Sequence, residues 1–149
     1  MKTVIQRVSH ASVTIDSKVK SSIGTGLLVL VGIGDDDGQE DIDWLVRKIA
    51  AMRIFDDSDG VMNLSVQDVG GEVMVVSQFT LMASCRKGNR PSYVKAAAPG
   101  FSIPMYERFC QCMEESIGKT VATGEFGADM KVQLLNDGPV TIVLDSKNR

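Results

Sequence analysis

The chain has 149 residues, of which 44% are hydrophobic and 23% charged, and its net charge at pH 7 is −3. The length predicts one domain over residues 1–149, large enough for a core without disulfides or metal. The net charge argues against a protein that coats nucleic acid, although a local basic patch could still bind phosphates. Three cysteines cannot complete a disulfide set, and the sequence has no signal peptide or membrane span, so we expect a cytoplasmic protein that does not bind membranes.

The first quarter of the chain is typical of β-structure. Residues 3–15 are rich in β-branched side chains and alternate toward their end, which predicts a strand with an irregularity near His10. A turn at Asp16 leads to a short return strand, residues 19–23. Residues 26–33 are almost wholly apolar, which indicates a strand covered on both faces.

The apolar period then changes from strand to helix and back. Residues 39–52 predict an amphipathic helix, because hydrophobic residues recur at helical spacing: Ile42, Leu45, Ile49 and Met52. Residues 62–66 alternate as in a half-buried strand, and residues 73–76 predict a buried one.

The last third begins with residues 82–99, the longest stretch without a clear period, which suggests a functional or mobile loop. Ser102 and Pro104 predict the start of a second helix, which Gly118 ends. Residues 121–126 predict a strand. Strands thus outnumber about two helices, and helices after the third and fifth strands suggest crossovers, hence an α/β fold with a mixed sheet.

Several catalytic chemistries lack their residues. His10 is the only histidine and no Cys-x-x-Cys pair occurs, so multi-histidine metal sites and zinc sites are not expected. A Ser-His-Asp triad would need His10, for which a structural role is the favoured interpretation. No phosphate-binding glycine loop precedes a helix, and the acidic run at residues 35–37 completes no calcium loop.

Two stretches of the sequence are candidates for a functional site. Ser77, Gln78 and Thr80 stand where a buried strand surfaces, with Phe79 among them, and backbone N–H groups at such a position can bind a developing oxyanion. An ordinary polar strand end is the alternative. The second stretch, residues 135–141, contains Asn-Asp-Gly-Pro between two apolar runs. Taken alone, it favours a β-hairpin turn.

Together the two stretches resemble the paired signatures of the D-aminoacyl-tRNA deacylases, also called the D-tyrosyl-tRNA deacylase family. The resemblance covers nearly the whole chain, and Tyr93, where phenylalanine is more usual, is a small departure. It also includes the segments Gln6-Arg7-Val8, Ala11-Ser12-Val13, Gly26-Leu27-Leu28-Val29, Met62-Asn63-Leu64, Arg90-Pro91-Ser92-Tyr93 and Thr123-Gly124-Glu125-Phe126-Gly127-Ala128-Asp129-Met130.

The resemblance implies a layered α/β/β homodimer that hydrolyses the ester between a D-amino acid and the terminal adenosine of tRNA. A wall that excludes the side chain of an L-residue should also admit glycine, which has no side chain. The resemblance implies no cofactor and no metal, and it places the site at the subunit interface. The implied roles are substrate and chirality selection by Gly138 and Pro139 through a cis peptide bond, backbone N–H donation by Phe79 beside Gln78, substrate binding by Ser77, an adenine pocket of Phe126 and Met130, and support of the turn by Arg7.

Three questions stay open at this stage. Thr80 is the obvious nucleophile candidate, but no base is securely placed near it, so we expect the ribose 2′-OH of the substrate to assist instead. A related deacylase that tolerates L-alanyl-tRNA, a hydrolase of another small ester and a non-enzymatic RNA-binding module are alternatives. Finally, Arg86, Lys87, Arg90 and Lys95 form a basic cluster, which either contacts tRNA phosphates or is simply solvated.

Overall fold

A computed structural model describes residues 1–149. Strands β1 (Lys2–Ile15), β2 (Lys18–Ile23), β3 (Gly26–Gly32), β6 (Glu72–Ser77), β7 (Ala122–Thr123) and β8 (Lys131–Asp145) form one sheet, and β4 (Phe55–Asp56) pairs with β5 (Met62–Leu64). The helices are α1 (Gln39–Ala51), α2 (Pro99–Ile117) and the short 3₁₀ helix η1 (Phe79–Met82).

The large sheet is mixed, which confirms the predicted fold class. Its strand order is β2-β1-β3-β6-β7, and β8 pairs with β1. The β3–β6 and β6–β7 pairs are parallel, and the pairs made by β1 are antiparallel. The two parallel pairs follow from the crossovers through α1 and α2, because a parallel partner can be reached only by a long connection.

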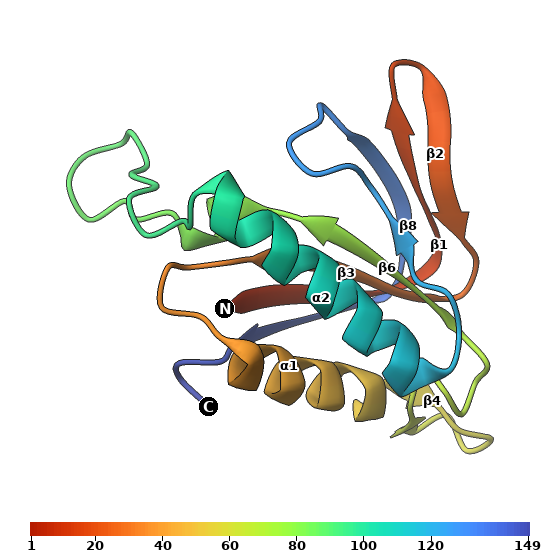
Figure 1. Cartoon of the computed structure of the whole chain (residues 1–149). Helices are drawn as coiled ribbons and strands as arrows, with labels where there is room; N and C mark the ends of the chain where they lie inside the picture. The colour runs from red at the N-terminus through yellow and green to blue at the C-terminus, as the bar shows by residue number, and fades with distance from the viewer.

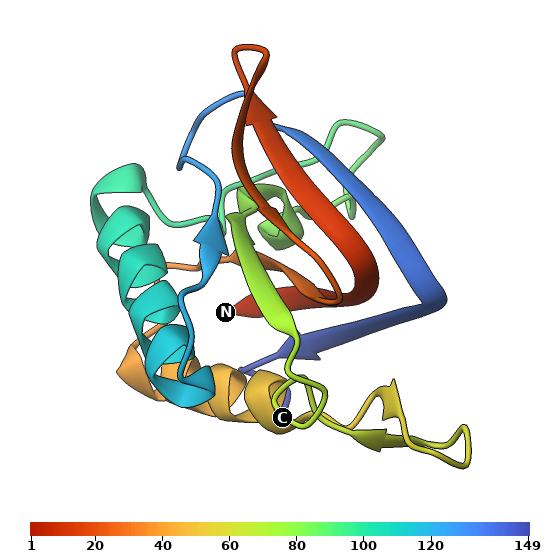
Figure 2. The ribbon, with the colours of Figure 1, turned by 90° about the vertical axis from the view of Figure 1, so that its right-hand side faces the viewer.

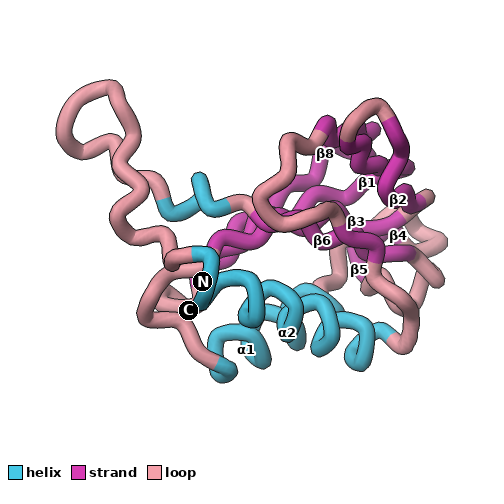
Figure 3. Tube along the Cα trace, turned by 45° about the horizontal axis from the view of Figure 1, so that its top comes forward, coloured by secondary structure: helices cyan, strands magenta, loops and turns pink.

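The sheet curls, and the helices cover one of its faces (Figures 1 and 3). Alternation along the central strands divides the core in two. Leu27 and Val29 of β3 join the larger cluster, which α1 and α2 cover, whereas Leu28 joins a second cluster enclosed by the curled sheet. Ser21 of β2 donates a hydrogen bond to the carbonyl of Thr123, so β2 approaches β7 as in a partly closed barrel. The layers are therefore α/β/β.

β8 does not form the β-hairpin that its turn residues favour. It is one strand, antiparallel to β1 along its length, and Figure 2 shows its sharp bend on the side away from the helices. Gln6 is paired with Thr141 and Val8 with Asn136, so residues 137–140 bulge from the ladder. The predicted irregularity of β1 near His10 is confirmed, because the register shifts again between Val8 and His10.

Other boundaries also differ from the sequence prediction. Helix α2 begins at Pro99, three residues before Ser102, because proline suits the first turn of a helix and Pro104 is also accommodated. The strand predicted at residues 121–126 is only Ala122–Thr123. Gly118 ends α2, as predicted, and it adopts the left-handed conformation. No helix has both the length and the apolar character needed to cross a membrane.

Candidate active site

A cavity of about 280 Å³ opens at the carboxyl ends of the parallel strands β3 and β6. This end of a parallel sheet is the usual place for ligands, because the connecting loops diverge there. The cavity is lined by fourteen residues: Val31, Ile33, Val76, Ser77, Gln78, Phe79, Ala97, Ser102, Phe126, Gly127, Ala128, Asp129, Met130 and Val132.

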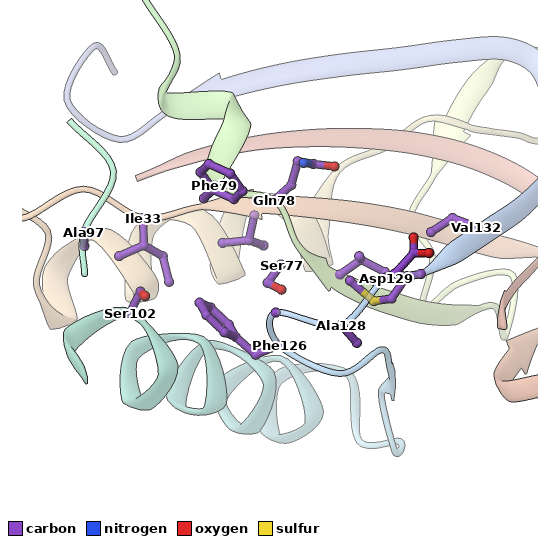
Figure 4. A pocket seen from close by; sticks show the side chains of 14 residues that line it. Ile33, Ser77, Gln78, Phe79, Ala97, Ser102, Phe126, Ala128, Asp129 and Val132 are labelled. Atoms are coloured by element: carbon purple, nitrogen blue, oxygen red, sulfur yellow. The ribbon is translucent and has the colours of Figure 1, made fainter. Parts of the chain in front are cut away.

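Five of the predicted site residues meet in this cavity. Figure 4 shows Ser77 between the ring of Phe79 on one side and that of Phe126 on the other. Gln78 and Met130 complete the group. The residues come from β6, η1 and the segment between β7 and β8, so three separate parts of the chain build the pocket.

The wall of the cavity turns at Gln78. The Gln78 N–H donates to the carbonyl of Val31 at 2.7 Å, which extends the β3–β6 pairing by one residue. The chain then enters η1 and does not continue as a strand, so the predicted strand surfaces at Ser77 and ends there. The N–H of Phe79, at the first position of a helical turn, has no acceptor within that turn.

A glycine in β3 allows this turn to pack closely. A Cβ atom on Gly32 would lie 2.8 Å from the Cβ of Leu81 and 3.0 Å from the carbonyl oxygen of Gln78. The first contact is shorter than real Cβ atoms make and the second is tighter than most, so a side chain at this position would force β3 and η1 apart. Gly32 thereby helps to fix where Phe79 enters the cavity.

Thr80 lies outside the residues that line the cavity. Its hydroxyl accepts a hydrogen bond from the side-chain amide of Gln78, which cannot act as a base. His10 is exposed on β1, opposite Leu135, and also does not line the cavity. Burial raises the pKa of the Cys110 thiol to about 11. None of these groups resembles an activated nucleophile.

Tyr106, which the sequence prediction missed, packs behind the cavity wall against Phe126. Its hydroxyl donates to the carbonyl of Val75 at 2.8 Å, and its ring contacts that of Phe126 with centroids 6.2 Å apart. Burial is the main reason why its pKa is raised. Extending the helical period back from Phe109 through Tyr106 to Ser102 could have identified this buried face, because the three residues share i, i+3 and i+4 spacing.

The Gly138-Pro139 turn lies elsewhere. Both residues are exposed and neither lines the cavity. Their peptide bond is cis, as the resemblance implies. Gly138 has a φ of +130°, and a Cβ there would lie 2.8 Å from Cγ2 of Val140. This backbone conformation and this contact both require glycine.

Arg7 lies directly beneath the turn. It is 7% exposed, and its Nε donates to the carbonyl of Asp137 at 2.9 Å. Its Nη1 donates to the carbonyl of Ile54 at 2.6 Å and lies 3.5 Å from a carboxylate oxygen of Asp56. The planar guanidinium thus connects the bulge of β8 to the segment after α1.

No group of three or more histidine, cysteine or carboxylate side chains gathers in the structure as a metal site would need.

The chain is similar to known proteins over almost its whole length. Residues 4–145 match the family model described as D-Tyr-tRNA(Tyr) deacylase. Proteins named D-aminoacyl-tRNA deacylase from Bacteroides thetaiotaomicron and Flavobacterium johnsoniae are 64% and 66% identical over 149 residues, covering 100% of this chain and 99% of each relative.

Solved structures share the fold. One titled c-Myc DNA Unwinding Element Binding Protein aligns with a TM-score of 0.93 at 40% identity, covering 97% of this chain and 98% of that one. A probable eukaryotic D-amino acid tRNA deacylase aligns with a TM-score of 0.81 at 17% identity, over 96% and 97% of the two chains. The second shows the fold alone. Because the family model and the full-length relatives agree, this chain belongs to the D-Tyr-tRNA(Tyr) deacylase family.

Proposed function

We propose that this chain, as one domain over residues 1–149, hydrolyses the ester bond of D-aminoacyl-tRNA, releasing the free D-amino acid and the tRNA. The cavity built by Ser77, Gln78 and Phe79 at the end of β6, in a chain of this family, is the observation that carries the proposal. Hydrolysis removes D-amino acids from tRNA before they enter translation. It also removes glycine that has been attached to the wrong tRNA.

The cavity holds the 3′ end of the substrate. The terminal adenine lies against Phe126 and Met130, an aromatic ring and a flexible thioether that suit a flat base. Ser77 contacts the substrate at the centre of the cavity. The scissile ester then lies near Phe79, whose backbone N–H donates to the carbonyl oxygen as it becomes an oxyanion. Gln78 orients this group through its position between β6 and η1.

The reaction needs no protein nucleophile. Water adds to the ester carbonyl, and the 3′-oxygen of the ribose leaves with a proton from the neighbouring 2′-OH, which is restored by the proton that water gives up. The environment of Thr80 agrees with this route. Its hydroxyl is hydrogen-bonded only to the side-chain amide of Gln78, and Thr80 lies outside the cavity lining. Positioning and the oxyanion donor then supply most of the rate.

Chirality is read by the Gly138-Pro139 turn of a second subunit. In its own chain the turn is exposed and does not line the cavity, so the turn of a homodimer partner completes the site. β8 also has an unpaired edge and exposed apolar side chains, Leu135 and Val143. A wall of main-chain carbonyls binds the ammonium group and excludes the side chain of an L-residue without reading its identity.

An assay with matched esters tests the function. We expect hydrolysis of D-tyrosyl-tRNA and glycyl-tRNA, little hydrolysis of L-tyrosyl-tRNA, and slow hydrolysis of a D-tyrosine alkyl ester that lacks the adenosine. Rapid hydrolysis of L-alanyl-tRNA would favour the tolerant sibling group. Equal rates on the alkyl ester would favour a general small-ester hydrolase, and binding without turnover would favour an RNA-binding module.

A further inference from the structure

The segment from Ser84 to Lys95, here called the basic loop, has a charge opposite to that of the whole protein. It carries Arg86, Lys87, Arg90 and Lys95, and no aspartate or glutamate occurs between Glu72 and Glu107. The net charge of the chain is −3. The loop is therefore a local region of positive potential on an acidic protein.

The loop has a defined shape. Ser84 and Ser92 exchange two backbone hydrogen bonds of 2.9 Å each, which close its base. Between its arms lies a shallow concavity of about 580 Å³, lined by Ser84, Arg86, Lys87, Ser92, Val94 and Lys95. None of the four cationic side chains in the loop forms an ion pair within the chain. Cations and hydroxyls that converge without acids are the donor set that binds phosphate.

Both ends of the loop lie close in sequence to residues that line the cavity. The loop follows η1, whose first residue, Phe79, lines the cavity, and it leads to Ala97, which also lines it. The rings of Tyr93 and Phe79 make an edge contact with centroids 5.1 Å apart. Figure 1 shows the loop extending beyond η1, away from the β1–β2 hairpin. The basic loop is therefore in direct contact with the cavity wall at Phe79.

We propose that the basic loop binds the backbone phosphates of the single-stranded 3′ end of the tRNA, next to the nucleoside held in the cavity. The inference rests on the proposed function. A terminal adenosine carries its first phosphate on its 5′ side, and each further nucleotide adds one negative charge. The loop therefore contributes to substrate binding and to its salt dependence, and it does not take part in the chemical step.

The test is the triple variant Arg86→Gln/Lys87→Gln/Arg90→Gln, compared with Lys18→Gln/Lys20→Gln/Lys48→Gln. The control removes the same charge from exposed side chains of β2 and α1. Each protein is assayed on D-tyrosyl-tRNA and on 3′-O-D-tyrosyl-adenosine, which has no phosphate. We expect the loop variant to raise KM for the tRNA by about tenfold with kcat unchanged, and to reduce the slope of log KM against log salt concentration by about 2.

The two substrates separate the possible failures. The adenosine ester should be hydrolysed equally by the wild type and both variants. If the loop variant matches the control on both substrates, the loop is only solvated and the inference is wrong. If the wild-type protein hydrolyses neither ester, the proposed function itself fails. A loss of kcat on the adenosine ester would also overturn the inference, because it would mean that the loop shapes the cavity.

Discussion

The cavity wall and the Gly138-Pro139 turn belong to the same sheet, but the strands that form them are paired differently. β6 is paired on both sides, and the N–H of Gln78, the residue directly after it, donates to Val31 of β3. β8 is paired on one side only, and its bulge is exposed. An exposed turn that lies away from the cavity of its own chain fits the proposed site shared between two copies.

The largest expected effect comes from Gly138→Ala. The added methyl group meets Val140 and a backbone with φ of +130°, so the turn must move. We expect kcat/KM for D-tyrosyl-tRNA to fall at least about 100-fold. Gly60→Ala is the matched control, because Gly60 also has positive φ, at +74°, but has open space around it and lies far from β8 in sequence. Wild-type rates in Gly138→Ala would mean that the turn is no part of the site.

Mixing two inactive variants tests directly whether the turn of one subunit completes the cavity of the other. Ser77→Phe fills the cavity, while Gly138→Ala damages the turn. If each turn completes the partner's cavity, a mixed dimer has one intact site, so random exchange should restore about one quarter of wild-type activity. If each turn serves its own chain, the mixture stays inactive. Sedimentation that shows an active monomer at assay concentration would refute the dimer altogether.

The next prediction concerns the chemistry inside the cavity. Because Thr80 has no base and lies outside the lining, Thr80→Ala should keep kcat within about tenfold of wild type. D-tyrosyl-tRNA ending in 2′-deoxyadenosine, charged on its 3′-OH, should react about 100-fold more slowly than the ribose substrate. Single-turnover rates measure both. A trapped acyl-enzyme, with loss of activity in the variant, would instead identify Thr80 as the nucleophile.

Arg7→Lys tests how the turn is held. A lysine keeps the charge but cannot donate to the carbonyls of both Asp137 and Ile54 as the planar guanidinium does. We expect about a tenfold loss in kcat/KM, together with a lower melting temperature. The control is Arg53→Lys, because Arg53 also donates to a backbone carbonyl, that of Asn63, but its side chain is exposed. An unchanged kcat/KM in Arg7→Lys would separate Arg7 from the turn.

The smallest effect is on stability at low pH, and it concerns the far end of β8. Burial opposes ionisation of Asp41, but hydrogen bonds from Ser146, Lys147 and the N–H of Gly38 outweigh it and lower its pKa to about 2. The folded-state pKa is thus below the unfolded value, so this contribution is complete above about pH 4 and is lost as the pH falls toward 2.

Urea unfolding at pH 5 and pH 2.5 measures this contribution. The difference in unfolding free energy between the two pH values should shrink by on the order of 2 kcal/mol in Asp41→Asn. Asp43→Asn, an exposed carboxylate on the same helix, is the control. Activity at neutral pH should stay unchanged in both, because Asp41 holds the end of the strand and not the turn. Equal pH dependence in the two variants would contradict the assignment.

Local patterns in the sequence determined much of this protein. Strands β1, β2, β3 and β6, helix α1 and the parallel crossovers follow from hydrophobic period, turn residues and segment order, and the resemblance identified the family. The helix stripe at Ile42, Leu45 and Ile49 is buried as predicted, because periodicity reports which face meets a core.

The tertiary structure decided the features that depend on contacts between distant parts of the chain. The Asn-Asp-Gly-Pro turn is chemically suited to a hairpin, but β1 is long enough to pair with both flanking runs, so β8 remains one strand with a bulge. The strand ends after Ser77 and enters η1, and Gly32 leaves the space in which η1 packs against β3. The distance between Gly138 and the cavity, and the contact of Arg7 with the turn, depend on pairings between residues more than 100 positions apart, which no local period records.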